Sequence, residues 1–176
     1  MFPKAHAAAY VMSAIRLGWY KIYMPTVFYA AMFTVAPKGF DAEIVLRGKK
    51  YLENYIKDIE QRGKDASPKE QDSIPSFQLA MEAYARGVKF LPVNINLSDS
   101  RCYRPEGDKA IRLPFSSLSG LGENAAENII KAREEEPFFS IEDLQTRAKL
   151  TKSVIEVLRR NGVLDGIQET DQLSIF

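Results

Sequence analysis

The stretch that most constrains this chain is Leu118–Ile130, LSGLGENAAENII, in which two glycines flank one apolar residue directly before a helical pattern. Gly120 and Gly122 permit a tight turn with positive φ and a close approach of the backbone to another molecule. A helix that begins directly after them leaves its first N–H groups unpaired and points the positive end of its dipole outward. The sequence therefore predicts a turn that can hold a phosphate group.

Apolar and small residues around this turn predict how it is fixed. Leu118 and Leu121 are expected to anchor it in the core, and Ala125 and Ala126 to let a second helix pack closely. The pattern resembles the helix-hairpin-helix motif of DNA-binding proteins, with a serine where proline is common, and an ordinary turn between two helices is the alternative. Main-chain amides at such a turn hold phosphates and read no bases. The predicted DNA-binding residues are Ser119, Gly120, Leu121, Gly122, Glu123 and Asn124.

Residues 140–164, SIEDLQTRAKLTKSVIEVLRRNGVL, are interpreted first as packing support, and a degenerate second copy of this motif is the alternative. Ser140 and Thr151 are plausible helix caps in this segment. The segment lacks the Gly-apolar-Gly turn, so it is a weaker candidate for phosphate binding. Its cations are either auxiliary phosphate contacts or part of a solvated helix face, and they are Lys149, Lys152, Arg159 and Arg160.

The first 40 residues are predicted to form two apolar helices, over 5–24 and 26–34, with Pro25 between them. The apolar run 22–37 contains this proline and is shorter than the roughly 20 residues of a membrane span, so no membrane partner is expected. The whole chain has a net charge of only +1, yet this end contains four cations and no acid. An anionic partner at this end is one explanation, and chance together with a buried helix is the other.

The middle of the chain is predicted to contain two more helices and a pair of strands. Asp41 is expected to cap a helix with apolar residues at helical spacing as far as Ile59, and residues 61–73 to form an exposed linker. The next helix is predicted to begin near Pro75. Two short strands are expected within 101–115, around Glu106-Gly107-Asp108, so the fold class is mainly α with a short β-hairpin.

Cysteine and histidine usage excludes several classes of site. Cys102 and His6 are the only residues of their types, so the chain has no disulfide framework and cannot form a zinc site with four such ligands. They also make a poor catalytic pair, and Cys102 is interpreted as inert. No metal site is expected, and a single cysteine fits a reducing compartment.

The last residues, DQLSIF, are unusual for a chain end because three of them are large and apolar. Leu173, Ile175 and Phe176 follow a polar run, so they either fold back onto the domain or are kept for a partner. Gln172 adds an amide that can donate and accept hydrogen bonds. Ser174 is interpreted as a spacer between pocket-filling residues.

Four stretches of this chain together resemble one family: FPKAHAAAY, GVKFLPVNIN, SLSGLGENAAENIIKAREE and QLSIF. They occur in this order in the C-terminal part of bacterial replicative DNA polymerases of family C, and the resemblance is closest to PolC-type DNA polymerase III alpha subunits. It covers essentially the whole chain. Members of the family are far longer, so Met1 is expected to begin a fragment.

The resemblance assigns a role to each part of the chain. Residues 1–90 would be a helical remainder of the fingers, 91–117 short strands and a linker, 118–166 the helix-hairpin-helix region that contacts product duplex (primer-template) DNA, and 167–176 a flexible tail. Near the incoming nucleotide, Phe2 would line the base-side pocket and Lys4 and His6 would face phosphate, although His6 also fits a capping or packing role. The residues that would dock in the beta sliding clamp are Gln172, Leu173, Ile175 and Phe176.

The resemblance also implies what the chain lacks. The carboxylates that hold two metal ions, magnesium in the parent enzyme, lie upstream in such polymerases, so no catalytic residue and no cofactor is assigned and no primer extension by this chain alone is expected. The expected partners are duplex DNA, the sliding clamp and the remainder of the polymerase, in the cytoplasm. A stand-alone, non-enzymatic DNA-binding module that associates with the clamp is the main alternative. A helical interaction protein without a nucleic-acid role is a third.

Overall fold

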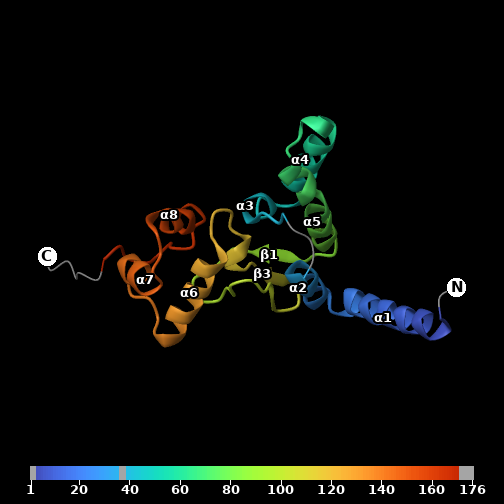
Figure 1. The fold of residues 1–176 in the computed structure, drawn as a ribbon, viewed down its shortest axis with the longest axis horizontal. Coiled ribbons are helices and arrows are strands. Elements are labelled where there is room, and N and C mark those ends of the chain that lie inside the picture. The colour runs from blue at the N-terminus through green and yellow to red at the C-terminus, as the bar shows by residue number, and fades with distance from the viewer. Residues whose placement is uncertain (1–2, 36–38, 171–176) are drawn as a thin grey trace.

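The computed structural model describes residues 3–35 and 39–170, and their fold is mainly α with one small sheet, as predicted (Figure 1). Two short 3-10 turns, Gly63–Asp65 and Phe115–Ser117, connect larger elements. The helices are α1 (Lys4–Tyr23), α2 (Pro25–Val35), α3 (Ala42–Val45), α4 (Lys49–Arg62), α5 (Pro68–Ala85), α6 (Glu123–Glu135), α7 (Ile141–Arg147) and α8 (Lys152–Arg160). The strands are β1 (Lys89–Leu91), β2 (Arg104–Glu106) and β3 (Ala110–Arg112).

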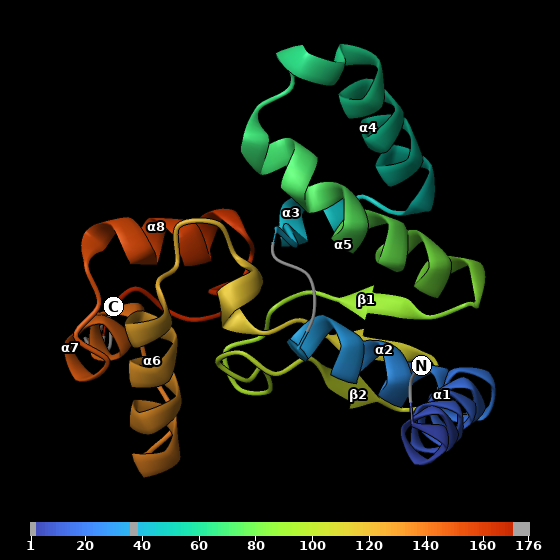
Figure 2. The same cartoon turned by 45° about the vertical axis from the view of Figure 1, so that its right-hand side comes forward.

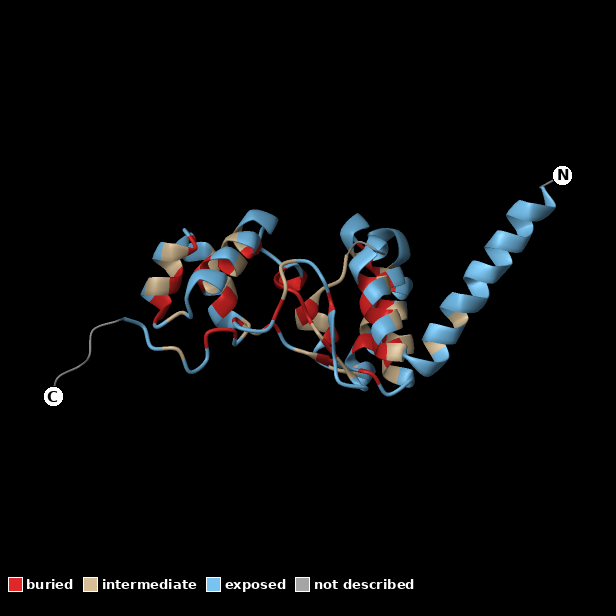
Figure 3. Cartoon of the chain, turned by 90° about the horizontal axis from the view of Figure 1, so that it is seen from below, coloured by how far each residue is buried: buried red, intermediate tan, exposed pale blue. Residues whose placement is uncertain are grey.

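Helix α1 projects from one end of the molecule and contains no buried residue (Figures 1 and 3). It ends at Tyr23, one residue before the predicted end at Met24, and Pro25 begins α2. An ion pair between Lys21 Nζ and Glu82 Oε1, 2.6 Å apart, connects its last turn to α5. Helix α2, in contrast, buries Tyr29, Ala30 and Phe33 in the core.

The single helix predicted after Asp41 is two helices in the structure. Asp41 caps α3 as predicted, because its carboxylate accepts a hydrogen bond from the Glu43 N–H at 2.9 Å. Gly48, with a φ of +92°, then breaks the helical path and precedes α4. The periodic apolar residues Leu52 and Ile59 are buried on one face of α4, as their spacing indicates.

The prediction of an exposed linker over 61–73 is wrong, because α5 begins at Pro68 and Pro75 lies inside it. A reciprocal cap explains the early start: the Glu70 N–H donates to Ser67 Oγ at 3.3 Å, and the Ser67 N–H donates to Glu70 Oε2 at 2.9 Å. Hydrogen bonds from Arg62 and Ser67 lower the pKa of Glu70 to about 2. The polar run is therefore a helix start, stabilised by capping although Pro75 lacks a backbone donor. Figure 2 shows the resulting α4–α5 pair side by side.

The sheet has the strand order β1-β3-β2. Strands β2 and β3 form the predicted antiparallel hairpin, with Pro105 opposite Ile111. Strand β1 pairs parallel to β3, with Phe90 opposite the same Ile111. The segment of β1 was predicted only as a short apolar stretch, because three residues are too few to show an alternating pattern.

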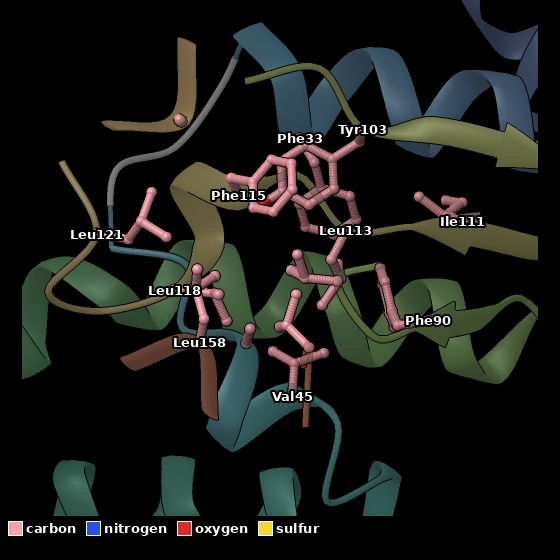
Figure 4. Close-up of a cluster of buried hydrophobic side chains, with 14 of the residues drawn as sticks. Phe33, Val45, Phe90, Tyr103, Ile111, Leu113, Phe115, Leu118, Leu121 and Leu158 are labelled. Atoms are coloured by element: carbon pink, nitrogen blue, oxygen red, sulfur yellow. The ribbon is translucent and has the colours of Figure 1, made fainter. Parts of the chain in front are cut away.

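One continuous cluster of buried apolar side chains joins the sheet to helices on both sides of it. Figure 4 shows Phe33 from α2 and Val45 from α3 in the same cluster as Leu113, Phe115 and Leu158. The two helical parts of the chain therefore share a core. Among the described helices, none is both long enough and apolar enough to cross a membrane.

Candidate nucleic-acid interface

The turn of the predicted helix-hairpin-helix motif, residues 118–122, connects the 3-10 turn Phe115–Ser117 to α6 and is called the hairpin below. Its anchors are buried as predicted, with Leu118 and Leu121 both facing the core, whereas Ser119 and Gly120 between them are exposed. The Leu121 N–H donates to the Leu118 carbonyl at 3.2 Å and closes the turn. Figure 4 shows Leu118 and Leu121 directed towards the buried cluster. The side chains thus fix the turn while its backbone faces solvent.

Helix α6 begins without a side-chain cap. Its N-cap is Gly122, which has no side chain that could accept a hydrogen bond from the first turn. Helices α3, α5, α7 and α8 each begin with such a bond, from Asp41, Ser67, Ser140 and Thr151 respectively, whereas α1 and α4 resemble α6 in lacking one. The start of the 13-residue α6 therefore presents main-chain donors that a helix leaves without internal partners. Main-chain donors at a helix start are suited to binding an anion.

The two glycines of the turn differ in conformation. Gly120 has a φ of +92°, as predicted, and a Cβ atom there would lie 3.3 Å from Val157 Cγ2 of α8. Gly122 has a φ of −75°, so the prediction of a positive φ is wrong at this residue, and a Cβ atom there would meet no atom within 4 Å. The turn requires glycine at 120. The folded chain does not require it at 122, where the missing side chain leaves the start of α6 accessible.

The remaining predicted contact residues, Glu123 and Asn124, are the first two residues of α6 and both are exposed. The Glu123 carboxylate forms an ion pair with Arg101, with 2.5 Å between Arg101 Nη1 and Glu123 Oε1. Sequence reasoning did not select Arg101, because 22 residues separate it from its partner and no local pattern connects them. A loop between β1 and β2 brings it to the hairpin.

The segment α7–α8 repeats the backbone geometry of the hairpin. Lys149 has a φ of +52°, which makes it the counterpart of Gly120. Thr151, the N-cap of α8, has φ and ψ of −76° and 157°, against −75° and 157° for Gly122. Leu150 is buried between them, as Leu121 is in the first turn. The structure therefore contains a second turn of similar backbone geometry without glycine, which favours the alternative of a degenerate copy over packing support alone.

The four auxiliary cations of this second turn fall into two groups. Arg159 forms ion pairs with Glu156 and Glu169, and Arg160 forms one with Glu43 of α3 at 2.8 Å. Lys149 and Lys152, by contrast, form no ion pair with any carboxylate in the described part of the chain, and both are exposed. The lysines therefore have charge available for a ligand, whereas the arginines connect elements.

The other predicted site residues do not gather at this surface. Lys4 and His6 lie in the first turns of α1, at the opposite end of the molecule from α6, and the His6 ring centroid is 5.9 Å from that of Tyr10 (Figure 1). Phe2 lies outside the described residues, as do the predicted clamp-binding residues Gln172, Leu173, Ile175 and Phe176. Over residues 3–35 and 39–170, no group of three or more His, Cys, Asp or Glu side chains is arranged to hold a metal ion.

The chain end is held against α7 as far as the structure describes it. The Ile141 N–H donates to the Gln168 carbonyl at 2.9 Å, and the Glu142 N–H donates to the Glu169 carbonyl at 3.1 Å. The ion pair of Glu169 with Arg159 fixes the same residues to α8. Residues 168 and 169 are therefore held against the first residues of α7 and, through Arg159, against the end of α8.

Comparisons with known proteins agree with the motif and extend it. A family model described as a helix-hairpin-helix motif matches residues 87–173. The whole chain is 44% identical to a segment of the DNA polymerase III PolC-type of Halalkalibacterium halodurans, and 43% identical to segments of those of Oceanobacillus iheyensis and Bacillus subtilis. All 176 residues are matched in each case, and they cover 12% of each relative.

The different conformations of the two glycines predict different stabilities for two variants. Gly120→Ala should lower the free energy of unfolding by about 1–2 kcal/mol, because an L-residue is strained at positive φ and its methyl group would crowd Val157. Gly122→Ser should leave it unchanged or raise it by a few tenths of a kcal/mol, since a serine can cap α6. Urea unfolding of both variants measures the difference. Equal losses of stability would contradict the assignment of distinct roles.

Proposed function

We propose that this chain, which corresponds over its whole length to a segment of PolC-type DNA polymerase III, holds duplex DNA by its sugar-phosphate backbone as part of such a polymerase. The observation that supports this most directly is the uncapped start of α6 behind the exposed Ser119–Gly120 turn. Main-chain N–H groups there can bind phosphate oxygens. Such contacts fix position on the duplex and carry no base specificity.

The accessible surface at Gly122 supports the same proposal. The fold tolerates a side chain at this residue, so the glycine is best explained by the close approach of a ligand to the backbone. The second turn would bind a neighbouring phosphate through Lys149 and Lys152. Because α8 packs against the first turn through Val157, both turns belong to one rigid surface.

The mode of binding follows from the charges. With a net charge of only +1, the chain has little general attraction to a polyanion, so contacts at the two turns would supply most of the affinity. Only about two to four phosphates would be neutralised, which implies weak binding. Within the longer polymerase, weak contacts of this kind would hold the product duplex while allowing it to slide.

We further propose that the remainder of the polymerase covers α1. The large apolar residues of this helix that are more than half exposed are Tyr10, Val11, Met12, Ile15, Leu17, Trp19, Ile22 and Tyr23. At 3.6 residues per turn, Val11, Ile15 and Ile22 lie on one side and Tyr10 and Leu17 on another. A helix that is apolar all round belongs in the interior of a larger protein. The curated relatives supply that larger protein, because this chain spans only 12% of their length.

This surface favours a polymerase segment over a stand-alone module that associates with the clamp. A module that functions alone would expose the apolar residues of α1 to solvent, where they promote association. In the polymerase, we propose that the beginning of α1 lies near the incoming nucleotide, with Lys4 and His6 facing its phosphates and Phe2 near its base. The metal-binding carboxylates of the reaction would lie in the remainder of the polymerase, which acts in the cytoplasm.

We propose that the last residues bind the beta sliding clamp, through Gln172, Leu173, Ile175 and Phe176. Burial of the three apolar side chains in a cleft of the clamp contributes roughly 1.5–3 kcal/mol each. Ordering a short peptide offsets part of that gain, so the dissociation constant is expected to be of micromolar order. The attachment of Gln168 and Glu169 to the start of α7 means that this segment would continue from the surface of the α7–α8 pair.

Duplex binding by this chain tests the proposed role of the hairpin. The wild-type chain should bind duplex DNA weakly and without sequence preference, and log K should fall with log salt with a slope of about −2 to −4. Gly122→Val should abolish binding in a folded protein, because the isopropyl group would occupy the approach to the main-chain donors. Fluorescence anisotropy with unrelated duplexes measures both effects. Unchanged affinity of a folded Gly122→Val variant would remove the hairpin from the interface.

Trp19, the single tryptophan of the chain, reports on the proposed burial of α1. Its fluorescence in the isolated chain should be quenched by acrylamide, because 51% of the residue is exposed. Addition of the remainder of the polymerase as a separate polypeptide should shift its emission to shorter wavelength and protect it. The same mixture with Trp19→Phe supplies the background spectrum. If the two polypeptides associate and Trp19 remains equally quenched, α1 is not the covered surface.

Deletion of the last five residues tests the proposed contact with the sliding clamp. Deletion of residues 172–176 should abolish binding to the sliding clamp and leave the melting temperature and duplex affinity almost unchanged. Ser174→Ala, the matched control, should bind the clamp like the wild type. Calorimetric titration and thermal unfolding measure the two properties. A large fall in melting temperature on deletion would mean that these residues belong to the core.

A further inference from the structure

The loop that carries Arg101 is fixed to the segment that leads into the hairpin. The Phe115 N–H donates to the Asp99 carbonyl at 2.9 Å, and the Ser116 N–H donates to the Ser100 carbonyl at 3.0 Å. The buried Ser98 hydroxyl donates to the Leu113 carbonyl at 2.7 Å. These bonds place the loop and the hairpin in one rigid unit.

Asp99 holds the backbone of Arg101 within this loop. Its Oδ1 accepts hydrogen bonds from the N–H groups of Arg101 and Cys102, both at 3.1 Å, and its Oδ2 accepts one from Arg104 Nη2 at 2.7 Å. Burial raises the pKa of Asp99, but these hydrogen bonds outweigh burial and lower it to about 2. The carboxylate is therefore charged at neutral pH, and the turn at Arg101 is formed before any ligand binds.

The side chain of Arg101 extends from this turn to the start of α6. Its guanidinium contacts the Glu123 carboxylate, and the two side chains are 66% and 51% exposed. An ion pair this exposed contributes little to stability, so a stronger anion can replace it. A guanidinium has five N–H donors, and it can contact a phosphate while keeping one bond to Glu123.

The position of Glu123 makes Arg101 necessary for an anionic ligand. Glu123 is the first residue of α6, so its carboxylate lies beside the main-chain donors that would bind a phosphate. The negative charge of Glu123 stabilises the start of α6 in the free protein, and it would repel a phosphate bound there. A cation at this place both neutralises the carboxylate and supplies a charged donor.

We propose that Arg101 is a phosphate-binding residue of this interface, held beside the helix start by Glu123 in the free protein and bound to the DNA backbone in the complex. This inference rests on the proposed function, because it concerns the same duplex and the same hairpin. It adds a residue outside the helix-hairpin-helix motif, from a loop that the sheet and Asp99 hold in place.

The test measures duplex affinity and its salt dependence for the full chain with Arg101→Gln. Affinity should fall about tenfold and the slope of log K against log salt should become smaller in magnitude by about one, as expected for the loss of one phosphate contact. Lys57→Gln is the matched control, because Lys57 carries the same charge, pairs with Glu53 on α4 and is exposed. It should change neither the affinity nor the slope by a comparable amount.

A second pair of variants separates a phosphate contact from neutralisation of Glu123. Glu123→Gln should bind duplex more tightly than the wild type, and adding Arg101→Gln to it should still remove about one unit of slope. If Arg101→Gln has no effect in that background, Arg101 acts only on Glu123 and the inference is overturned. The same follows if Arg101→Gln resembles Lys57→Gln. If the wild-type chain does not bind duplex at all, the proposed function fails first, and the inference fails with it.

Discussion

Burial of Leu118 and Leu121 on either side of an exposed two-residue turn is the constraint on which the rest of this structure depends. The two side chains occupy the core, so the backbone between them must face solvent. Loss of a buried leucine side chain typically destabilises a domain by about 2–5 kcal/mol, so this conformation is strongly enforced. Leu118 and Leu121 belong to the same buried cluster as Val45 of α3 and Leu158 of α8. The position of the turn therefore depends on helices from both the N-terminal and the C-terminal part of the chain.

The molecule therefore has two ends with opposite surface chemistry. At one end, the start of α6 presents main-chain donors, and the turn that leads into α8 presents Lys149 and Lys152. At the other end, α1 presents aromatic and aliphatic side chains, and an ion pair of Lys21 with Glu82 connects it to the body (Figure 1). The first surface is suited to a polyanion that can slide, and the second to permanent burial. A segment that lies, as proposed, between the body of a polymerase and its product duplex would need both.

Local signals predicted much of this arrangement. Pro25, the Asp41 cap and the turn around Gly107 act over a few residues, and the elements that they define are present. The start of α5 was misplaced because Gly63, Pro68 and the polar residues of 61–73 suggested a linker, although the Ser67–Glu70 pair within it is a capping signal. Strand β1 and the Arg101–Glu123 pair depend on segments that only the folded chain brings together. The prediction of a positive φ at Gly122 was wrong because a sequence does not distinguish a glycine at an accessible helix start from one at a positive φ.

Cys102 gives the loop beside the hairpin a property that has nothing to do with charge. It is the single cysteine of the chain and it is exposed, in the turn that Asp99 holds directly after Arg101. A thiol-directed dye or spin label would therefore attach at one place, on a rigid support next to the surface proposed for DNA. Oxidation of the same thiol to a sulfinic or sulfonic acid would add an anion there. The loop would then repel the backbone that Arg101 is proposed to attract, so a thiol that is inert in the proposed binding would still weaken it once oxidised.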